Sequence, residues 1–179
     1  MRVAIRHGRL VDPAHRIDAE TDLFVAEGRI AGVGQSPEGF NTDREIDARD
    51  RIVCPGLIDL CARLREPGQE HKATIASETA AAVAGGVTTL VCPPDTDPVI
   101  DEPAVVELIR RRAKAAGQAR VLTLGALTHR LCGERLAEMA ALQEAGCVGV
   151  GDGGRPVAST RVLRRALEYT APFGLTEFL

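Results

Sequence analysis

The sequence predicts an α/β fold in two parts, with a small all-β region over 1–54 and a parallel sheet over 55–179. In the first part, short apolar runs are separated by polar turns, and no helical pattern intervenes. In the second part, apolar runs alternate with amphipathic helical segments, which is typical of parallel strands joined by helical crossovers. Since the chain has no Trp and only 3% aromatic residues, its core must consist of Val, Leu, Ile and Ala.

The all-β region is expected to contain short strands joined by tight turns. Glu27-Gly28 lies between two apolar runs and predicts the turn of a hairpin. A sheet of this size has little core of its own, so we expect it to pack on another part of the protein. The expected strands are 3–6, 9–12, two strands of the hairpin over 21–34, and one or two strands over 44–55.

The second region predicts five strands that alternate with four helices. Asp101 is expected to cap the second helix, with Pro103 in its first turn and Gly117 at its end. Ser159 is expected to cap the fourth helix. The expected strands are 57–61, 87–92, 120–127, 147–151 and 175–179, and the expected helices are 72–84, 101–117, 133–146 and 159–171.

Two architectures contain five parallel strands in this order. One is a complete open α/β domain, and the other is the first part of a (β/α)₈ barrel, which usually needs about 250 residues. A parallel strand is stable only beside neighbouring strands and helices, and no helix follows the fifth expected strand. Together with the preceding β region, this favours the N-terminal part of a barrel.

Charge and cysteine content exclude several classes of protein. A net charge of −3 argues against nucleic-acid binding, which requires a basic face. The longest apolar runs are too short to cross a bilayer, so no membrane association is expected. The five cysteines include no C-x-x-C pair, and an odd number without a framework fits a reducing compartment. We therefore expect a cytoplasmic protein.

The segment 55–68 reads PGLIDLCARLREPG and resembles the dihydroorotases of the amidohydrolase superfamily, which usually have PGLIDxHxHxREPG. Segment 72–101, with CPPDTDPVID at its end, resembles their next βα unit, which usually carries MPNT. GALT and GCVGVGDGG resemble their third and fourth strands with the following loops. The resemblance implies a small β-sandwich domain and the first five βα units of an amidohydrolase-type (β/α)₈ barrel.

The resemblance implies that the metal ligands of the first strand have been replaced. Residues i and i+2 of a strand face the same side, so an H-x-H pair aims two imidazoles at one point, where they can hold zinc. The corresponding residues here are Cys61 and Arg63. A Cys61 thiolate could still bind zinc, but Arg63 has no acceptor and places a fixed positive charge where a dication would lie.

Three further positions match the family's site. Asp95 stands where the asparagine of MPNT helps to hold a substrate carboxylate, and an acid there would repel that group. Arg65 matches the other carboxylate-binding residue. Asp152 matches a position that supplies a metal-bridging side chain, and Gly153 follows where a second aspartate is often found. The resemblance thus leaves Asp152 as the only retained candidate metal ligand.

Cys61, Arg63, Asp95 and the Pro93-Pro94 pair together resemble the inactive branch of the family. Those pseudo-dihydroorotases are non-catalytic partners of aspartate carbamoyltransferase in pyrimidine biosynthesis. The resemblance implies an oligomeric assembly with that enzyme, no catalytic residue and no cofactor. The alternative is a zinc-dependent amidohydrolase that hydrolyses a cyclic amide at an atypical mononuclear site containing Asp152. A third possibility is an independent ligand-binding α/β domain.

Cys61 and Cys92 also have simple structural interpretations, because cysteine is among the most frequently buried residue types. We expect both to be small buried apolar residues, and a soft-metal site formed by the pair is a minor alternative. Arg63 is expected to pair with Asp95 or Asp152 and so to fill the former metal position. If it does neither, it is a solvated loop residue.

Local ion pairs and exposed positions explain the remaining charged residues most simply. Arg65 is expected to pair with Glu66 or Glu70. His129 is expected to be an ordinary surface or core histidine. The cluster Arg110–Arg112 is expected to form a solvated helix face, with an acidic partner as the alternative.

Overall fold

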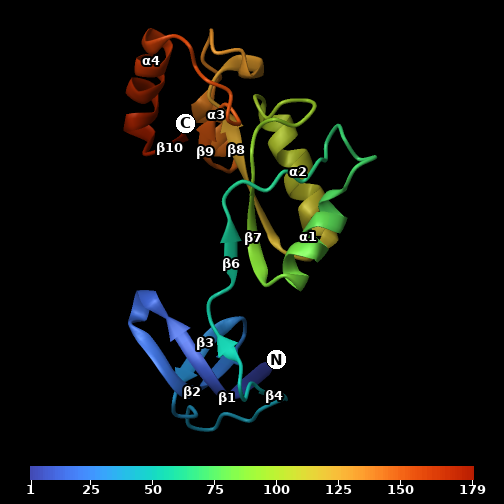
Figure 1. The fold of residues 1–179 in the computed structure, drawn as a ribbon, viewed down its shortest axis with the longest axis vertical. Coiled ribbons are helices and arrows are strands. Elements are labelled where there is room, and N and C mark those ends of the chain that lie inside the picture. The colour runs from blue at the N-terminus through green and yellow to red at the C-terminus, as the bar shows by residue number, and fades with distance from the viewer. The chain divides into compact units, whose positions relative to one another are not determined.

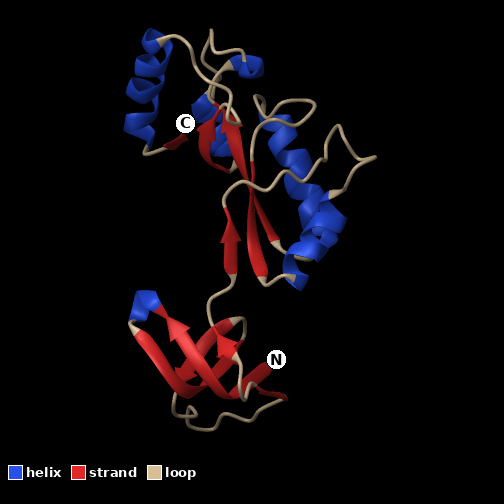
Figure 2. Cartoon of the chain, viewed as in Figure 1, coloured by secondary structure: helices blue, strands red, loops and turns tan.

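The computed structural model describes residues 1–179, which form two compact units, Met1–Pro55 and Gly56–Leu179 (Figure 1). The first unit is built almost entirely of strands, and the second combines a parallel sheet with flanking helices (Figure 2). The predicted α/β fold, with a β region followed by βα units, is confirmed.

The first unit is a five-stranded sheet with the order β3-β2-β1-β4, in which β5 also pairs with β1. The two short strands expected at the start of the chain form a single strand, β1, with a register shift between Ile5 and Gly8. The hairpin turn at Glu27-Gly28 is confirmed. The strands are β1 Arg2–Asp12, β2 Ile17–Ala26, β3 Arg29–Val33, β4 Arg44–Asp47 and β5 Ile52–Val53.

The second unit contains five parallel strands in the order β10-β9-β8-β7-β6. Each strand lies beside its neighbour in sequence, as in a (β/α)₈ barrel, whereas a doubly wound sheet reverses its order at a switch point. The barrel-type arrangement is therefore confirmed. The strands are β6 Leu57–Asp59, β7 Val87–Cys92, β8 Arg120–Ala126, β9 Cys147–Gly151 and β10 Thr176–Phe178.

Four helices follow the first four of these strands. Thr74 caps α1 through a reciprocal capping box with Ser77, and Gly117 ends α2 in the left-handed conformation with φ of 64°. Ser159 caps α4, as predicted. No helix combines the length and the apolar character needed to cross a bilayer. The helices are α1 Ile75–Ala84, α2 Pro103–Ala116, α3 Met139–Ala145 and α4 Thr160–Thr170.

Two of the expected helix starts are wrong. Asp101 does not cap α2, since Glu102 takes the N-cap position and makes no side-chain hydrogen bond. The third helix begins at Met139 and not near 133, because the preceding residues fold back on Thr128. The Gly133 amide donates to the Thr128 hydroxyl at 2.9 Å, and Thr128 forms a bridge with Leu136.

The core of the second unit lies between the strands and the helices. Leu90 of β7, Ile75 of α1 and Ile109 of α2 are buried in one cluster, which extends to Leu142 of α3. Burying a side chain of this size contributes about 1.5–3 kcal/mol, so this cluster is the main support of the sheet. β6 and β10 form the edges of the sheet.

We predict that Ile109→Ala lowers the free energy of unfolding by about 2–5 kcal/mol, because it leaves a cavity in this core. Leu167→Ala on α4 is the matched control, since that side chain is 50% exposed and its loss should cost less than about 0.5 kcal/mol. Urea denaturation followed by circular dichroism measures both changes. Equal effects of the two substitutions would contradict this placement of the core.

Candidate functional site

The candidate site lies at the carboxyl ends of the parallel strands. These ends meet at the same edge of the sheet, so the loops that follow β6, β7, β8 and β9 lie near one another. The loops bring together Arg63, Asp95, Thr128 and Asp152, which are far apart in the sequence. This is the edge of the sheet at which active sites occur in (β/α)₈ barrels.

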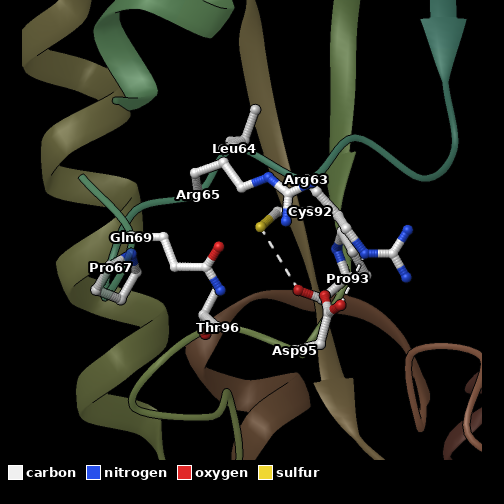
Figure 3. A pocket seen from close by; sticks show the side chains of 9 residues that line it. All are labelled: Arg63, Leu64, Arg65, Pro67, Gln69, Cys92, Pro93, Asp95 and Thr96. Atoms are coloured by element: carbon white, nitrogen blue, oxygen red, sulfur yellow. Dashed lines mark hydrogen bonds and ion pairs between the residues drawn. The ribbon is translucent and has the colours of Figure 1, made fainter. Parts of the chain in front are cut away.

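Arg63 and Asp95 form an ion pair across two of these loops. The Arg63 Nε donates to the Asp95 Oδ2 at 2.7 Å (Figure 3). The Arg63 Nη2 donates to the Gly153 carbonyl at 3.2 Å. The hydrogen bond with Asp95 raises the pKa of Arg63. Of the two partners that the sequence allowed, Arg63 therefore selects Asp95 and not Asp152.

Asp152 is buried and bonded to a different residue. Its Oδ1 accepts from the Thr128 amide at 2.9 Å and its Oδ2 accepts from the Thr128 hydroxyl at 2.6 Å. The Thr128 hydroxyl in turn accepts from the Gly133 amide. Both oxygens of this carboxylate are thus used to join the loops after β8 and β9, which satisfies the hydrogen-bonding needs of a buried charge.

Gly153 leaves room for the ion pair. Its φ is 65°, and a Cβ placed on it would lie 3.3 Å from the Asp95 Cβ. A larger residue would be strained by the backbone conformation and would press on Asp95. An aspartate would also bring a second negative charge next to that carboxylate. Glycine at position 153 and aspartate at position 95 therefore fit each other sterically and electrostatically.

The two cysteines near this edge differ in their environments. The prediction that Cys61 is buried is wrong, because its side chain is exposed where the short strand β6 has already ended. Its backbone amide donates to the Asp59 Oδ1 at 2.9 Å. Cys92 is buried, as predicted, and desolvation raises the pKa of its thiol to about 12. Cys92 is therefore a protonated core residue at neutral pH.

The prediction that Arg65 pairs with Glu66 or Glu70 is wrong, since Arg112 of α2 takes both partners. The Arg112 Nη1 lies 2.7 Å from the Glu66 Oε1 and 3.3 Å from the Glu70 Oε1. The Glu66 Oε2 also accepts from the Ile75 amide at 2.6 Å, in the first turn of α1. Spacing in the sequence gave no signal for a partner that is more than 40 residues away.

Arg65 makes no ion pair and adopts a left-handed backbone conformation with φ of 64°. With Gln69 and Thr96 it lines a cavity of about 20 Å³, into which its side chain extends (Figure 3). This space is sufficient for about one water molecule. The other residues that line the cavity are Arg63, Leu64, Pro67, Cys92, Pro93 and Asp95.

His129 follows β8 and pairs with the residue that was expected to cap α2. Its Nδ1 lies 2.9 Å from the Asp101 Oδ2, which also accepts from the Arg130 amide at 3.0 Å. The imidazole is partly exposed and does not line the cavity beside Arg63. His129 is therefore a surface residue that joins two loops, in agreement with the simple interpretation.

Zinc does not fit the side chains that stand at the expected ligand positions. Arg63 has five N–H donors and no acceptor, and its charge would oppose a dication. The oxygens of Asp152 are bonded to Thr128. Residues 1–179 contain no group of three or more His, Cys, Asp or Glu side chains arranged to hold a metal ion.

We predict that iodoacetamide at pH 8 alkylates Cys54, Cys61 and Cys132 rapidly and spares Cys92 and Cys147, which are buried. With a pKa near 12, the Cys92 thiol has about one thiolate in ten thousand at that pH. Because its folded pKa is raised, its contribution to stability is complete below pH 9 and is lost as the pH rises toward 12. Mass spectrometry of peptides measures the labelling, and the unfolded chain is the control. Rapid labelling of Cys92 in the folded chain would contradict its burial.

Comparison with known proteins agrees with this architecture. The structure resembles L-hydantoinase from Arthrobacter aurescens with a TM-score of 0.80 and 21% identity, over 98% of this chain and 39% of that one. It also resembles a D-hydantoinase with a TM-score of 0.71 and 22% identity, over 99% of this chain and 39% of that one. At this level of identity the likeness shows the fold alone.

Two curated relatives are much more similar in sequence. A dihydroorotase-like protein of Pseudomonas aeruginosa is 48% identical over 98% of this chain, and a dihydroorotase of Anaeromyxobacter sp. (strain K) is 47% identical over 96%. The chain spans 42% and 40% of their respective lengths. The family model described as dihydro-orotase-like matches residues 50–172. This match covers most of the chain, which therefore belongs to the dihydro-orotase-like family.

Proposed function

We propose that this chain belongs to a non-catalytic dihydroorotase-like protein that acts in the cytoplasm as a structural partner of aspartate carbamoyltransferase in pyrimidine biosynthesis. The observation that carries the proposal is the ion pair between Arg63 and Asp95. Arg63 stands where the family has its second metal-binding histidine, and Asp95 stands where the family has its carboxylate-binding asparagine. Each replacement neutralises the charge that the other introduces.

The chemistry of the guanidinium supports the loss of catalysis. An amidohydrolase of this kind uses a metal ion to activate water for attack on a cyclic amide. A guanidinium stays protonated at all accessible pH values and cannot donate a lone pair to a metal. In this chain it fills the ligand position and satisfies the adjacent carboxylate, so the loop needs no metal ion to balance its charge.

The remaining acid of the site supports the same interpretation. Asp152 is the one retained candidate ligand, and both of its oxygens accept hydrogen bonds from Thr128. This bonding gives the carboxylate a structural role that does not require a metal. The alternative is an amidohydrolase with an atypical mononuclear zinc site, in which Asp152 would bind the metal through the lone pairs that Thr128 leaves free.

The proposed partner comes from the resemblance to the inactive branch. Cys61, Arg63, Asp95 and the Pro93-Pro94 pair are the residues that carry this resemblance. The similarity to a protein named dihydroorotase-like in Pseudomonas aeruginosa is in line with it. The five cysteines are all free, as suits a reducing compartment. Preserving the strands and helices while replacing the site chemistry suits a protein whose work is assembly.

Metal analysis distinguishes the proposal from the zinc enzyme. We predict far less than about one zinc per chain after dialysis against buffer without chelator, and no hydrolysis of dihydroorotate. The double substitution Cys61→His and Arg63→His should raise zinc affinity, because it restores both imidazoles of the family's H-x-H motif and removes the Arg63 charge. It should not restore turnover, because Asp95 still repels the substrate carboxylate.

Elemental analysis and a spectrophotometric assay of dihydroorotate measure both quantities, with the single substitution Arg63→Gln as the control that removes the charge without adding a ligand. About one tightly bound zinc per unmodified chain, together with turnover, would favour the enzyme. Turnover in the double variant alone would show that the loop containing Asp95 matters less than proposed.

The partner is tested separately from the loss of catalysis. We predict that the chain co-elutes with aspartate carbamoyltransferase in size-exclusion chromatography and increases either its assembled fraction or its activity. A heat-unfolded sample of the chain is the control for non-specific association. If the transcarbamoylase is equally assembled and equally active without the chain, the structural role is wrong, whatever the metal analysis shows.

A further inference from the structure

A basic groove lies at the amino-terminal end of the parallel sheet, away from the loops that carry Arg63. It is formed by the second half of α2, by 117–119 and by the start of β8 at Arg120. Its volume is about 570 Å³, within the range of about 300–1,000 Å³ found for ligand sites. We refer to it as the α2–β8 groove.

The charge of the α2–β8 groove is strongly one-sided. Arg110, Arg111, Lys114 and Arg120 line it, and Glu107 is the only acid among the lining residues. Glu107 lies 3.6 Å from Arg110, which also donates to the Ala145 carbonyl at 3.0 Å. The other three cations form no ion pair. The net charge of the chain is −3, yet three unpaired cations line the α2–β8 groove.

Helix stabilisation accounts for only part of this charge. Cations in the last turn of a helix interact favourably with its dipole, and Lys114 lies in the last turn of α2. Arg120 belongs to β8, on the other side of the groove, and gains nothing from the dipole. Arg111 lies nearer the middle of α2. The cations thus reach the groove from both α2 and β8. Binding of an anion explains this arrangement better than stabilisation of the helix does.

The lining residues indicate which class of anion fits. Proteins that bind single-stranded nucleic acids usually stack bases on aromatic side chains, and this groove has none. Its remaining lining is small or apolar: Ala113, Gly117, Ala119 and Val121, with the amide of Gln118. Such a surface accommodates an extended peptide backbone, and the long cationic side chains can reach carboxylates at several positions.

We propose that the α2–β8 groove docks a short acidic segment of a partner protein, with its Asp and Glu side chains facing Arg111, Lys114 and Arg120. Because the rest of the chain is acidic overall, the attraction is local to the groove. The segment therefore binds at this site and is repelled elsewhere. This inference does not depend on the loss of catalysis or on the identity of the partner proposed above.

The test uses fluorescein-labelled octaglutamate and the whole chain, with fluorescence anisotropy as the measurement. We expect saturable binding that weakens as salt shortens the screening length from about 8 Å at 0.15 M to about 3 Å at 1 M. Arg111→Glu with Lys114→Glu should weaken binding about tenfold or more. Arg135→Glu with Arg161→Glu is the matched control, since it reverses two exposed, unpaired arginines outside the groove and should change affinity less than about twofold.

Three results would overturn the proposal. The first is no saturable binding of octaglutamate at low salt, and the second is an equal loss of affinity in the control with Arg135→Glu and Arg161→Glu. The third is tighter binding of a single-stranded oligonucleotide of equal charge, which would assign the groove to nucleic acid. If the charge reversal disturbs folding, as judged by circular dichroism, Arg111→Gln with Lys114→Gln replaces it and should still weaken binding severalfold.

Discussion

The Glu66 carboxylate fixes the loop on which the candidate site depends. One oxygen accepts from the Ile75 amide at the start of α1, and the other lies 2.7 Å from Arg112 of α2. The side chain is only 13% exposed, so water screens these contacts weakly. The segment between β6 and α1 contains no regular secondary structure. This side chain ties the segment to both helices, and backbone hydrogen bonds, such as the one from the Ala62 amide to the Val91 carbonyl at 2.9 Å, tie it to β7.

The Arg63–Asp95 ion pair matters for its chemistry more than for its contribution to stability. The two side chains are 42% and 25% exposed, and ion pairs of this kind contribute about 0–1 kcal/mol. The pair nevertheless limits what the site can hold, because it places a permanent cation at the position where the resemblance implies a metal ligand. Gly153 completes the arrangement by leaving the Asp95 side chain free of steric contact.

The sequence predicted the elements whose signals are local. β7 and β9 were predicted to the residue, because each is a short run that contains two valines and directly follows the glycine that ends a helical segment. The predictions that were wrong concern residues whose partners are distant in the sequence. Asp101 was predicted to cap α2, but its side chain accepts from the Arg130 amide. The third helix was predicted to begin near 133, but the residues there form hydrogen bonds with Thr128 and are not helical. The pairing of Arg63 with Asp95 was foreseen as one of two alternatives, because Arg63, Asp95 and Asp152 all follow neighbouring parallel strands. The contact between Arg112 and Glu66 was not foreseen, because no motif joins them.

The ion pair also changes what the loop requires from the cell. A metal centre takes its positive charge from the surroundings, and its occupancy follows the supply of the ion. Here the positive charge that balances Asp95 is the side chain of Arg63, which is part of the chain itself. If the proposed loss of the metal is correct, we expect zinc starvation to leave the geometry of this loop unchanged.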